Sequence, residues 1–273
     1  MNVDRYAVMG NPVAHSKSPQ IHHMFAEQTG QLLRYDTVLV PPGGFASAVR
    51  EFFDAGGKGL NVTVPFKQEA WKLADDLSPE AARASAVNTL VWQNDGRLSG
   101  DNTDGIGLVR DLIDNLHLEL QAKRILLLGA GGAARGVLAP LLEQRPAQLA
   151  IANRTVERAE QLAEEFSDLG ELHGCGFEAL EGSAYDLIIN ATAAGLCGEV
   201  PPLPEGIISG NTACYDMVYG AAPTAFVKYA RQCGASLAVD GLGMLVEQAA
   251  ASFRIWRGIQ PDTAPVIAAL RVQ

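Results

Sequence analysis

The chain is poor in the residues that build disulfide frameworks and metal sites. Its 273 residues include four cysteines without a CxxC pair and five histidines without an HxxxH pair. Such a pattern is typical of reduced thiols in a cytoplasmic protein, and we expect no metal. The cysteines lie about twenty residues apart, at Cys175, Cys197, Cys214 and Cys233.

Features of membrane and nucleic-acid-binding proteins are also missing. No uncharged apolar run is long enough to span a bilayer, and the opening MNVDRYAVMG lacks the basic start and apolar core of a signal peptide. Basic residues are outnumbered, at 21 against 31 acidic ones. This balance argues against nucleic-acid and anionic-membrane partners, so an anionic ligand has to be held by local basic groups.

What the sequence does contain is a regular alternation of short β-like runs with amphipathic stretches. This alternation predicts βαβ units, and so an α/β fold with mostly parallel sheets covered by helices. The length suits about two domains, and an apolar content of 48% suits an ordinary core. A domain boundary is expected near residues 102–116. The expected strands are residues 5–9, 34–40, 60–64, 88–92, 124–128, 147–152, 185–190 and 213–217.

A glycine-rich turn follows the most apolar of these strands. RILLL, residues 124–128, runs directly into GAGGAA, which fits the GxGxxG/A pattern between a strand and a helix. Gly129 permits a tight turn, Gly131 lets backbone amides approach a pyrophosphate, and the small Ala134 allows close packing of helix on strand. The motif therefore predicts dinucleotide binding. Pro140, in the same helical stretch, should bend or shorten the helix.

The residues after the next strand indicate which dinucleotide binds. NAD-binding domains carry an acidic residue there for the ribose 2′-hydroxyl. This chain instead has Asn153, Arg154 and Thr155, followed by Arg158. Two guanidinium groups at a helix start are suited to a 2′-phosphate, so we expect NADP rather than NAD. The alternative is that both arginines merely pair with neighbouring glutamates.

The first half of the chain contains a strand that stops at a proline and a cation. In NVTVPFK, residues 61–67, apolar and polar residues alternate until Pro65, which suits the end of a strand and not its middle. Lys67 follows immediately. A lone lysine in a loop is most often a solvated surface residue. A fixed position next to a strand end would instead make Lys67 a candidate for chemistry.

A second candidate stretch is GNPVAHSKSPQIHH, which follows the first strand. Ser18 before Pro19 predicts a helix start, with Ser18 as the N-cap. Ser18 could be only a cap, but Ser16 and Ser18 together place two hydroxyls beside free helix-end amides, which suits a carboxylate. The stretches HSKSP, NVTVPFK, AVNTL and GDNTDG all lie at or near strand ends, so one cleft could collect them.

Taken together, these motifs resemble the shikimate dehydrogenase family. GNPVAHSKSP, NVTVPFK, SAVNTL, GDNTDG, GAGGAARG, NRT, INAT, YDMVY and DGLGMLVEQAA occur in the order and approximate spacing of that family, over essentially the whole chain. The resemblance implies the reversible NADPH-dependent reduction of 3-dehydroshikimate to shikimate, in aromatic amino-acid biosynthesis.

The resemblance also implies two α/β domains that face each other across a cleft. Residues 1–104 would form the substrate-binding and catalytic domain. Residues 105–240 would form a Rossmann-type NADP-binding domain with a doubly wound parallel sheet. Residues 241–273 would be C-terminal helices that return to the first domain.

Site residues follow from the resemblance position by position. Lys67 and Asp104 are the implied catalytic pair. The implied substrate-binding residues are Ser16, Ser18, Thr63, Lys67, Asn88, Asp104, Tyr219 and Gln248. The pyrophosphate would lie on Gly129, Ala130, Gly131, Gly132, Ala133 and Ala134, where Ala134 is a mild departure from a final glycine. The 2′-phosphate would lie on Asn153, Arg154, Thr155 and Arg158, and the nicotinamide end near Thr192, Met217 and Gly241.

The implied chemistry suits the residue types. Hydride transfer to a ketone leaves negative charge on oxygen, which a proton-donating cation such as Lys67 can stabilise. Asp104 can hold a substrate hydroxyl and orient the ammonium group. Other residues have plain structural alternatives. Thr63 and Asn88 could merely form hydrogen bonds with free backbone groups at strand ends, and Gln248 could be an ordinary exposed helix residue. Likewise, YDMVYG with Tyr219 could be an aromatic turn.

Three alternative functions were compared with this interpretation. A broader quinate/shikimate dehydrogenase that uses NAD would favour an acidic residue in place of Asn153 and Arg154. A methylenetetrahydrofolate dehydrogenase would give no reason for HSKSP. A non-catalytic NADP-binding regulator would be expected to lack Lys67 or Asp104, and both are present. The expected partner is the small-molecule substrate, and we expect a monomer, with a dimer as the alternative.

Overall fold

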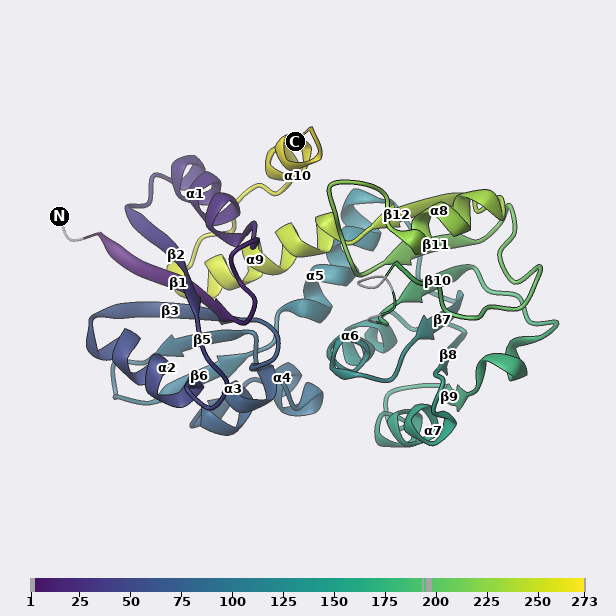
Figure 1. The fold of residues 1–273 in the computed structure, drawn as a ribbon, viewed down its shortest axis with the longest axis horizontal. Helices are drawn as coiled ribbons and strands as arrows, with labels where there is room; N and C mark the ends of the chain where they lie inside the picture. Colours follow the sequence, from purple (N-terminus) through teal and green to yellow (C-terminus); the bar gives the residue numbers. More distant parts are fainter. Residues whose placement is uncertain (1–2, 193, 195–197, 273) are drawn as a thin grey trace. The chain divides into compact units, whose positions relative to one another are not determined.

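The computed structural model describes residues 3–192, 194 and 198–272. The chain divides into two compact units (Figure 1). The first unit contains the chain up to Gly107 together with Val246–Val272. The second unit is Leu108–Leu245. The C-terminal segment therefore packs with the N-terminal part of the chain.

A mixed sheet forms the centre of the first unit. The strands are β1 (Asp4–Gly10), β2 (Leu33–Leu39), β3 (Gly57–Val62), β4 (Asp76–Leu77), β5 (Thr89–Trp92) and β6 (Leu98–Asp101). Their order across the sheet is β2-β1-β3-β5-β6-β4. β1 is parallel to both of its neighbours, whereas β5 is antiparallel to β3 and β6. The antiparallel pair arises from a hairpin turn in which Gly96 has a φ of 85°, a conformation that suits glycine.

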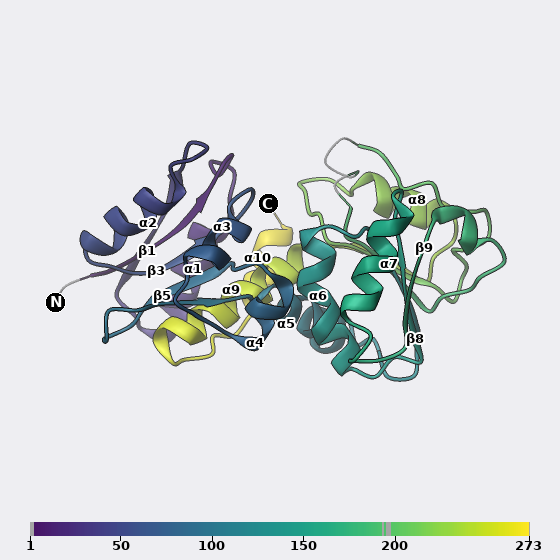
Figure 2. The same ribbon diagram turned by 90° about the horizontal axis from the view of Figure 1, so that it is seen from below.

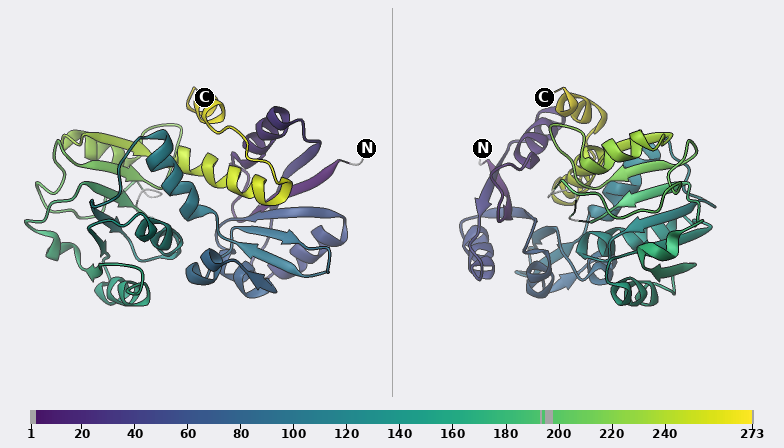
Figure 3. Two further views of the ribbon diagram at one scale, coloured as in Figure 1. Left: turned by 180° about the vertical axis from the view of Figure 1, so that it is seen from behind. Right: turned by 45° about the vertical axis from the view of Figure 1, so that its right-hand side comes forward.

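Both faces of this sheet are covered, because successive residues of a strand point to opposite faces. From β1, Ala7 and Met9 pack with α2 (Phe45–Asp54) and α3 (Lys67–Leu73). From the same strand, Tyr6 and Val8 pack on the other face. The helices on that other face are α1 (Ser18–Thr29) and α9 (Leu242–Arg257), and Figure 3 shows α9 running along the sheet. The remaining helices are α4 (Pro79–Ala84), α5 (Asp104–Arg110) and α10 (Ala264–Arg271).

The second unit has a parallel sheet. The strands are β7 (Arg124–Leu128), β8 (Gln148–Ala152), β9 (Leu172–Cys175), β10 (Leu187–Asn190), β11 (Ala213–Asp216) and β12 (Leu237–Asp240). Their order is β12-β11-β10-β7-β8-β9, and each neighbouring pair within the described residues is parallel. This order is that of a doubly wound dinucleotide-binding sheet: β8 and β9 extend it on one side of β7, and β10, β11 and β12 extend it on the other side. The expected α/β fold with a Rossmann-type sheet is therefore confirmed.

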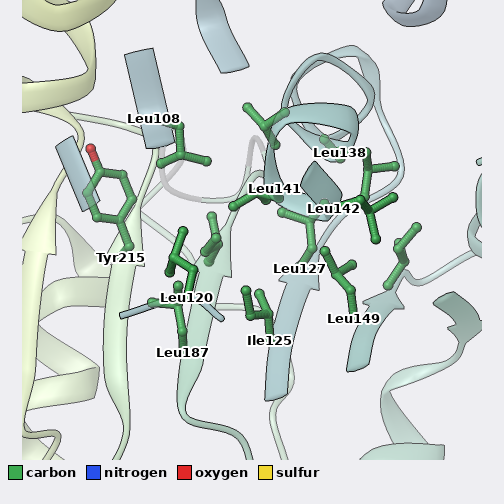
Figure 4. Close-up of a cluster of buried hydrophobic side chains, with 14 of the residues drawn as sticks. Leu108, Leu120, Ile125, Leu127, Leu138, Leu141, Leu142, Leu149, Leu187 and Tyr215 are labelled. Atoms are coloured by element: carbon green, nitrogen blue, oxygen red, sulfur yellow. The ribbon is translucent and has the colours of Figure 1, made fainter. Parts of the chain in front are cut away.

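Helices cover both faces of this second sheet. Its helical segments are α6 (Gly132–Glu143), α7 (Val156–Glu165), α8 (Ala225–Gln232), a π-helical segment (Asp111–Asn115) and a 3-10 turn (Phe177–Leu180). α6 and α7 lie side by side (Figure 2), linked by an Arg135–Glu165 ion pair at 2.5 Å. Figure 4 shows the apolar cluster under α6, to which Ile125 and Leu127 of β7 and Leu141 of α6 contribute.

Some local expectations were wrong. α6 continues through Pro140 to Glu143, so the expected shortening of the helix is wrong, while a bend at the proline stays a prediction. β3 ends at Val62 and not at residue 64. Strands β4, β6, β9 and β12 were not expected, because each is at most four residues long and, except in β12, no more than half of the residues are apolar. Within the described residues, no helix combines the length and apolar character that a membrane crossing requires.

Candidate active site

Lys67 is held at the first position of α3 by the residue before it. Phe66 is only 1% exposed and its ring stacks on Phe45, with centroids 5.1 Å apart. The carbonyl of Lys67 accepts a hydrogen bond from the amide of Val87 at 2.9 Å. Pro65, which we expected to fix the lysine, is itself exposed. The buried phenylalanine therefore anchors this position, and the proline only ends the extended segment.

Lys67 and Asp104 form a close ion pair. Lysine Nζ lies 2.5 Å from Asp104 Oδ2, and the two side chains are 29% and 13% exposed. Asp104 begins α5, where its amide donates to Oδ1 of Asn102 at 3.1 Å. Both groups are thus fixed at helix starts. Because water reaches this pair only in part, its electrostatic interaction is stronger than that of a fully exposed pair.

Asn88 fixes the other oxygen of the aspartate. Its Oδ1 accepts from the backbone amide of Thr103 at 2.9 Å, which determines the direction of the carboxamide. Its Nδ2 therefore donates to Asp104 Oδ1 at 2.8 Å, and lies 3.3 Å from Oε1 of Gln248. The structure thus brings together four of the predicted site residues: Lys67, Asn88, Asp104 and Gln248.

Thr63 lies close to the end of β1 because residue 10 is glycine. A Cβ at Gly10 would lie 2.3 Å from Cγ2 of Thr63 and 3.2 Å from the carbonyl oxygen of Val64. The amide of Thr63 donates to the carbonyl of Met9 at 2.9 Å. The glycine therefore permits the two strand-end segments, GNP and NVTV, to approach each other.

The serines of HSKSP lie at the start of α1, with one correction. The helix begins at Ser18, and the N-cap position belongs to Lys17, so Ser18 is not the N-cap. Instead, the amide of Ser18 donates to Oγ of Ser16 at 3.2 Å. Ser18 is only 7% exposed. Ser16 thus satisfies a helix-start amide, while the Ser18 hydroxyl is available for other contacts.

The glycine-rich turn has the geometry that its sequence predicts. Gly129 has a φ of 105°, in the region that favours glycine, and a Cβ there would lie 3.2 Å from Cγ2 of Thr192. Gly131 precedes α6, and a Cβ on Gly131 or Gly132 would meet no atom within 4 Å. Ala134 is fully buried against the sheet. This turn leaves open space at a helix N-terminus, which favours an anion.

The two arginines after β8 have no competing partners. Arg154 and Arg158 are exposed, and neither side chain makes an ion pair or hydrogen bond with another described residue. The alternative in which they pair with neighbouring glutamates therefore finds no support. Asn153 donates from Nδ2 to the carbonyl of Thr155 at 2.9 Å, which closes the turn before α7. Both guanidinium groups are thus exposed and without a competing partner among the described residues.

Three residues expected near the nicotinamide follow neighbouring strands. Thr192, Met217 and Gly241 come just after β10, β11 and β12, at the carboxyl edge of the parallel sheet. Thr192 donates from Oγ1 to Oδ1 of Asn190 at 2.7 Å. A Cβ on Gly241 would lie 2.5 Å from the carbonyl oxygen of Met217, so only glycine fits there. Ligands of such sheets bind at this edge.

Tyr219 is the one expected substrate-binding residue that belongs to the second unit. Its side chain is half-buried, and burial raises its pKa above the ordinary value. The thiols of Cys175, Cys214 and Cys233 are free, and Cys197 lies outside the described residues. Across the described chain, no group of three or more histidine, cysteine, aspartate or glutamate side chains is arranged to hold a metal ion.

Residues that the sequence did not single out form a hydrogen-bonded network around Asn88. They are buried polar side chains from strands β2, β3 and β5, from the segment after β6 and from α9: Tyr35, Asn61, Thr89, Thr103 and Ser252. Thr89 and Thr103 stand inside motifs that were recognised, next to Asn88 and Asp104. Their position next to predicted site residues was the one signal in the sequence that could have identified them as part of the site.

Comparisons with known proteins agree with this geometry. Residues 8–90 match the shikimate dehydrogenase substrate binding domain, residues 111–197 match shikimate / quinate 5-dehydrogenase, and residues 241–271 match the shikimate 5'-dehydrogenase C-terminal domain. A shikimate dehydrogenase (NADP(+)) from Alkalilimnicola ehrlichii is 62% identical over 98% of both chains. The chain belongs to the shikimate dehydrogenase family.

Solved structures of relatives have the same fold. An Ael1 enzyme from Pseudomonas putida is 46% identical, with a TM-score of 0.94 over 99% of both chains. A shikimate 5-dehydrogenase from Thermus thermophilus, crystallised in complex with NADP(H) and shikimate, is 36% identical, with a TM-score of 0.87 over 99% of both chains. The resemblance on which the site residues were assigned is thus confirmed at the level of the family.

Proposed function

We propose that this chain catalyses the reversible NADPH-dependent reduction of 3-dehydroshikimate to shikimate, with Lys67 and Asp104 as its catalytic pair. The observation that carries the proposal is the 2.5 Å ion pair between them, in which Asn88 holds the second carboxylate oxygen. A surface ion pair would not need a buried carboxamide to orient it. The Thermus thermophilus relative was crystallised with both ligands of this reaction.

In this proposal Lys67 acts on the carbonyl oxygen of the substrate. NADPH supplies the hydride when it is bound. The ammonium group of Lys67 stabilises the negative charge that develops on the oxygen, and it donates the proton that completes the hydroxyl group. Asp104 keeps the ammonium group in place and accepts a hydrogen bond from a neighbouring substrate hydroxyl. Asn88 and Gln248 would fix the ring through its other hydroxyls.

The remaining parts of the substrate and the cofactor have separate binding groups. Ser16 and Ser18 would bind the carboxylate at the start of α1, where helix amides favour an anion. The open turn over residues 129–134 would hold the pyrophosphate, and Arg154 and Arg158 would hold the 2′-phosphate. The fit is supported by the empty space around Gly131 and by the absence of competing partners for both arginines within the described residues.

The proposal extends to a monomer that acts in the cytoplasm, with a dimer as the alternative state. The location in the cytoplasm is supported by the free thiols of Cys175, Cys214 and Cys233, as expected in a reducing compartment. Burial raises the pKa of the Cys214 thiol to about 12, which makes that thiol unreactive. Sedimentation velocity at enzyme concentrations used for kinetics would distinguish monomer from dimer.

The replacement of Lys67 by alanine tests the chemistry. With shikimate and NADP, followed by absorbance of the nicotinamide, turnover should fall by about 10²–10⁴-fold, the usual effect of removing a positioned acid–base group. The KM for shikimate should change far less, because Ser16, Ser18 and Asn88 remain. Lys72→Ala is the matched control, since Lys72 is an exposed lysine on the same helix. Turnover of Lys67→Ala within threefold of wild type would contradict the proposal.

A further inference from the structure

A series of hydrogen bonds between buried side chains leads to the candidate catalytic pair. It begins at Tyr35 on β2 and continues through Asn61 on β3 and Thr89 on β5 to Asn88. Tyr35, Asn61 and Thr89 are 1%, 6% and 0% exposed. Buried polar groups of this kind need hydrogen-bond partners, since a buried group left unpaired destabilises the fold.

The direction of each bond can be assigned from its partners. The Tyr35 hydroxyl donates to Oδ1 of Asn61 at 2.7 Å. Nδ2 of Asn61 then faces the backbone carbonyl of Asn88 at 3.1 Å, Oγ1 of Thr89 at 3.2 Å and Oγ of Ser252 at 3.0 Å. The opposite orientation would place an amide oxygen against the Asn88 carbonyl, so only this direction is allowed.

The donor and acceptor of each further hydrogen bond, up to Asp104, can be assigned in the same way. Because Thr89 accepts from Asn61, its own proton is free to go to Oδ1 of Asn88 at 2.9 Å. This bond acts together with the backbone amide of Thr103, which donates to the same oxygen, so that Asn88 presents Nδ2 to Asp104. An amide cannot readily exchange its protons along such a chain, so the chain orients groups and does not conduct protons. Its end point is the carboxylate that pairs with Lys67.

Tyr35 also reaches the opposite end of the candidate substrate site. Burial raises the pKa of Tyr35, and the neighbouring Ser18 side chain partly opposes this rise. The ring of His22 stacks on that of Tyr35, with centroids 4.2 Å apart and planes 8° from parallel. The stacked ring thus holds the phenol between Ser18 and Asn61, and among the described residues the phenol makes no hydrogen bond to Lys67 or Asp104.

We propose that Tyr35 is a positioning residue that couples Ser18, at the carboxylate of the substrate, to Asn88 and Asp104, at the reacting carbon. This inference rests on the proposed function. Removal of the hydroxyl would leave Oδ1 of Asn61 without its donor and Ser18 without its neighbour. Both ends of the substrate would then be held less firmly.

Tyr35→Phe tests the proposal, because it removes the hydroxyl and keeps the ring. We expect kcat/KM for shikimate to fall about 5- to 10-fold, as for the loss of one buried hydrogen bond. The loss should divide between a higher KM for shikimate and a lower kcat. The KM for NADP should not change, since the candidate cofactor groups belong to the second unit. A merely damaged fold would lower kcat through inactive protein and leave the KM for shikimate unchanged.

Tyr6→Phe is the matched control. Tyr6 is 2% exposed on the same sheet face, its ring lies 4.8 Å from that of Trp256, and its hydroxyl accepts from Arg257. It should change kcat/KM by less than about twofold at a similar cost in stability. If Tyr35→Phe and Tyr6→Phe have the same kinetics while the wild type is active, the inference is wrong and the proposed function stands. A wild type inactive with shikimate would overturn the proposed function itself.

Thr89 provides an independent test of the chain, including the case in which Tyr35→Phe does not fold. Thr89→Val removes the hydroxyl and should lower kcat, whereas Thr89→Ser retains it and should restore most of the activity. In the Thr89→Val background, Tyr35→Phe should cost little further kcat, because the chain is already broken. Fully additive effects on ln kcat, or equal activities of Thr89→Val and Thr89→Ser, would refute the coupling.

Discussion

His22 should make the folded protein sensitive to acid, and His22→Phe should reduce that sensitivity. His22 lies on α1, is 1% exposed, and has neither ring nitrogen hydrogen-bonded to a described residue. Aromatic rings surround it, including Tyr35, Phe25 and Trp256. Burial lowers the pKa of His22 from its ordinary value near 6.5 to about 3, and the Asn61 side chain opposes this only in part.

The magnitude follows from proton linkage. In the unfolded chain the ring binds a proton below a pH of about 6.5, whereas in the folded protein it stays neutral until the pH approaches about 3. The contribution of His22 to the free energy of unfolding is therefore complete above pH 6.5 and is lost as the pH falls from there towards 3. The slope is about 1.4 kcal/mol per pH unit, so about 2 kcal/mol is lost between pH 7 and pH 5.

Denaturant unfolding at pH 7, 6 and 5 measures this loss. The protein has three tryptophans, Trp71, Trp92 and Trp256, and all three belong to the unit that contains His22, so their fluorescence reports on its unfolding. The wild type should lose about 2 kcal/mol more than His22→Phe between pH 7 and pH 5. The comparison uses differences between pH values, so a constant effect of the phenylalanine on stability cancels.

The neighbouring histidine supplies the control. His23 is exposed on the same helix, and His23→Gln should keep the wild-type dependence on pH. If His22→Phe loses as much stability between pH 7 and pH 5 as the wild type does, the ring is not held neutral by burial. The reasoning from its environment would then be refuted.

Two further predictions concern ligand choice. The wild type should prefer NADP over NAD by about tenfold or more in kcat/KM, and the double variant Arg154→Ala/Arg158→Ala should lose most of this preference. The loss of each charge-assisted contact should cost roughly 1.5–3 kcal/mol. Unchanged discrimination would show that other groups bind the 2′-phosphate. Shikimate should exceed quinate about a hundredfold in kcat/KM at saturating NADP, because the extra hydroxyl of quinate lies beside the carboxylate that Ser16 and Ser18 would hold closely. Comparable efficiencies would favour the broad-specificity alternative.

The four inner strands of the second sheet, β11, β10, β7 and β8, were predictable because their signals are local, whereas its edge strands β9 and β12 were missed. RILLL is buried on both faces in a parallel sheet, and a strand of that kind consists of a continuous apolar run with the glycine turn directly behind it. β7 therefore has the bounds that the sequence predicts. β6, with the sequence LSGD, was missed because two of its four residues are polar and one is glycine. The hairpin signal Asp95-Gly96 before it would have found the strand.

The candidate site was predictable only where motifs stand at strand ends. Lys67, Asn88 and Asp104 could be assigned through the family resemblance, and the structure brings them together. The start of α1 was misjudged by one residue, because a serine before a proline suits the N-cap and the first helical position almost equally. Local sequence does not decide between them; here the hydroxyl of Ser16, two residues back, accepts from the Ser18 amide.

The support beneath the site could not be predicted, and the reason lies in how a strand pattern is interpreted. In NVTV, polar residues alternate with apolar ones, which predicts a polar face turned to solvent. The structure instead covers that face with α9, and Asn61 bonds to Ser252 across 191 residues of sequence. Once α9 lies there, each buried polar group needs a partner, because an unpaired one costs about 1–3 kcal/mol. The same alternation that indicates an exposed face in an isolated strand therefore corresponds, in this fold, to a buried layer of hydrogen-bonded side chains that orients Asn88.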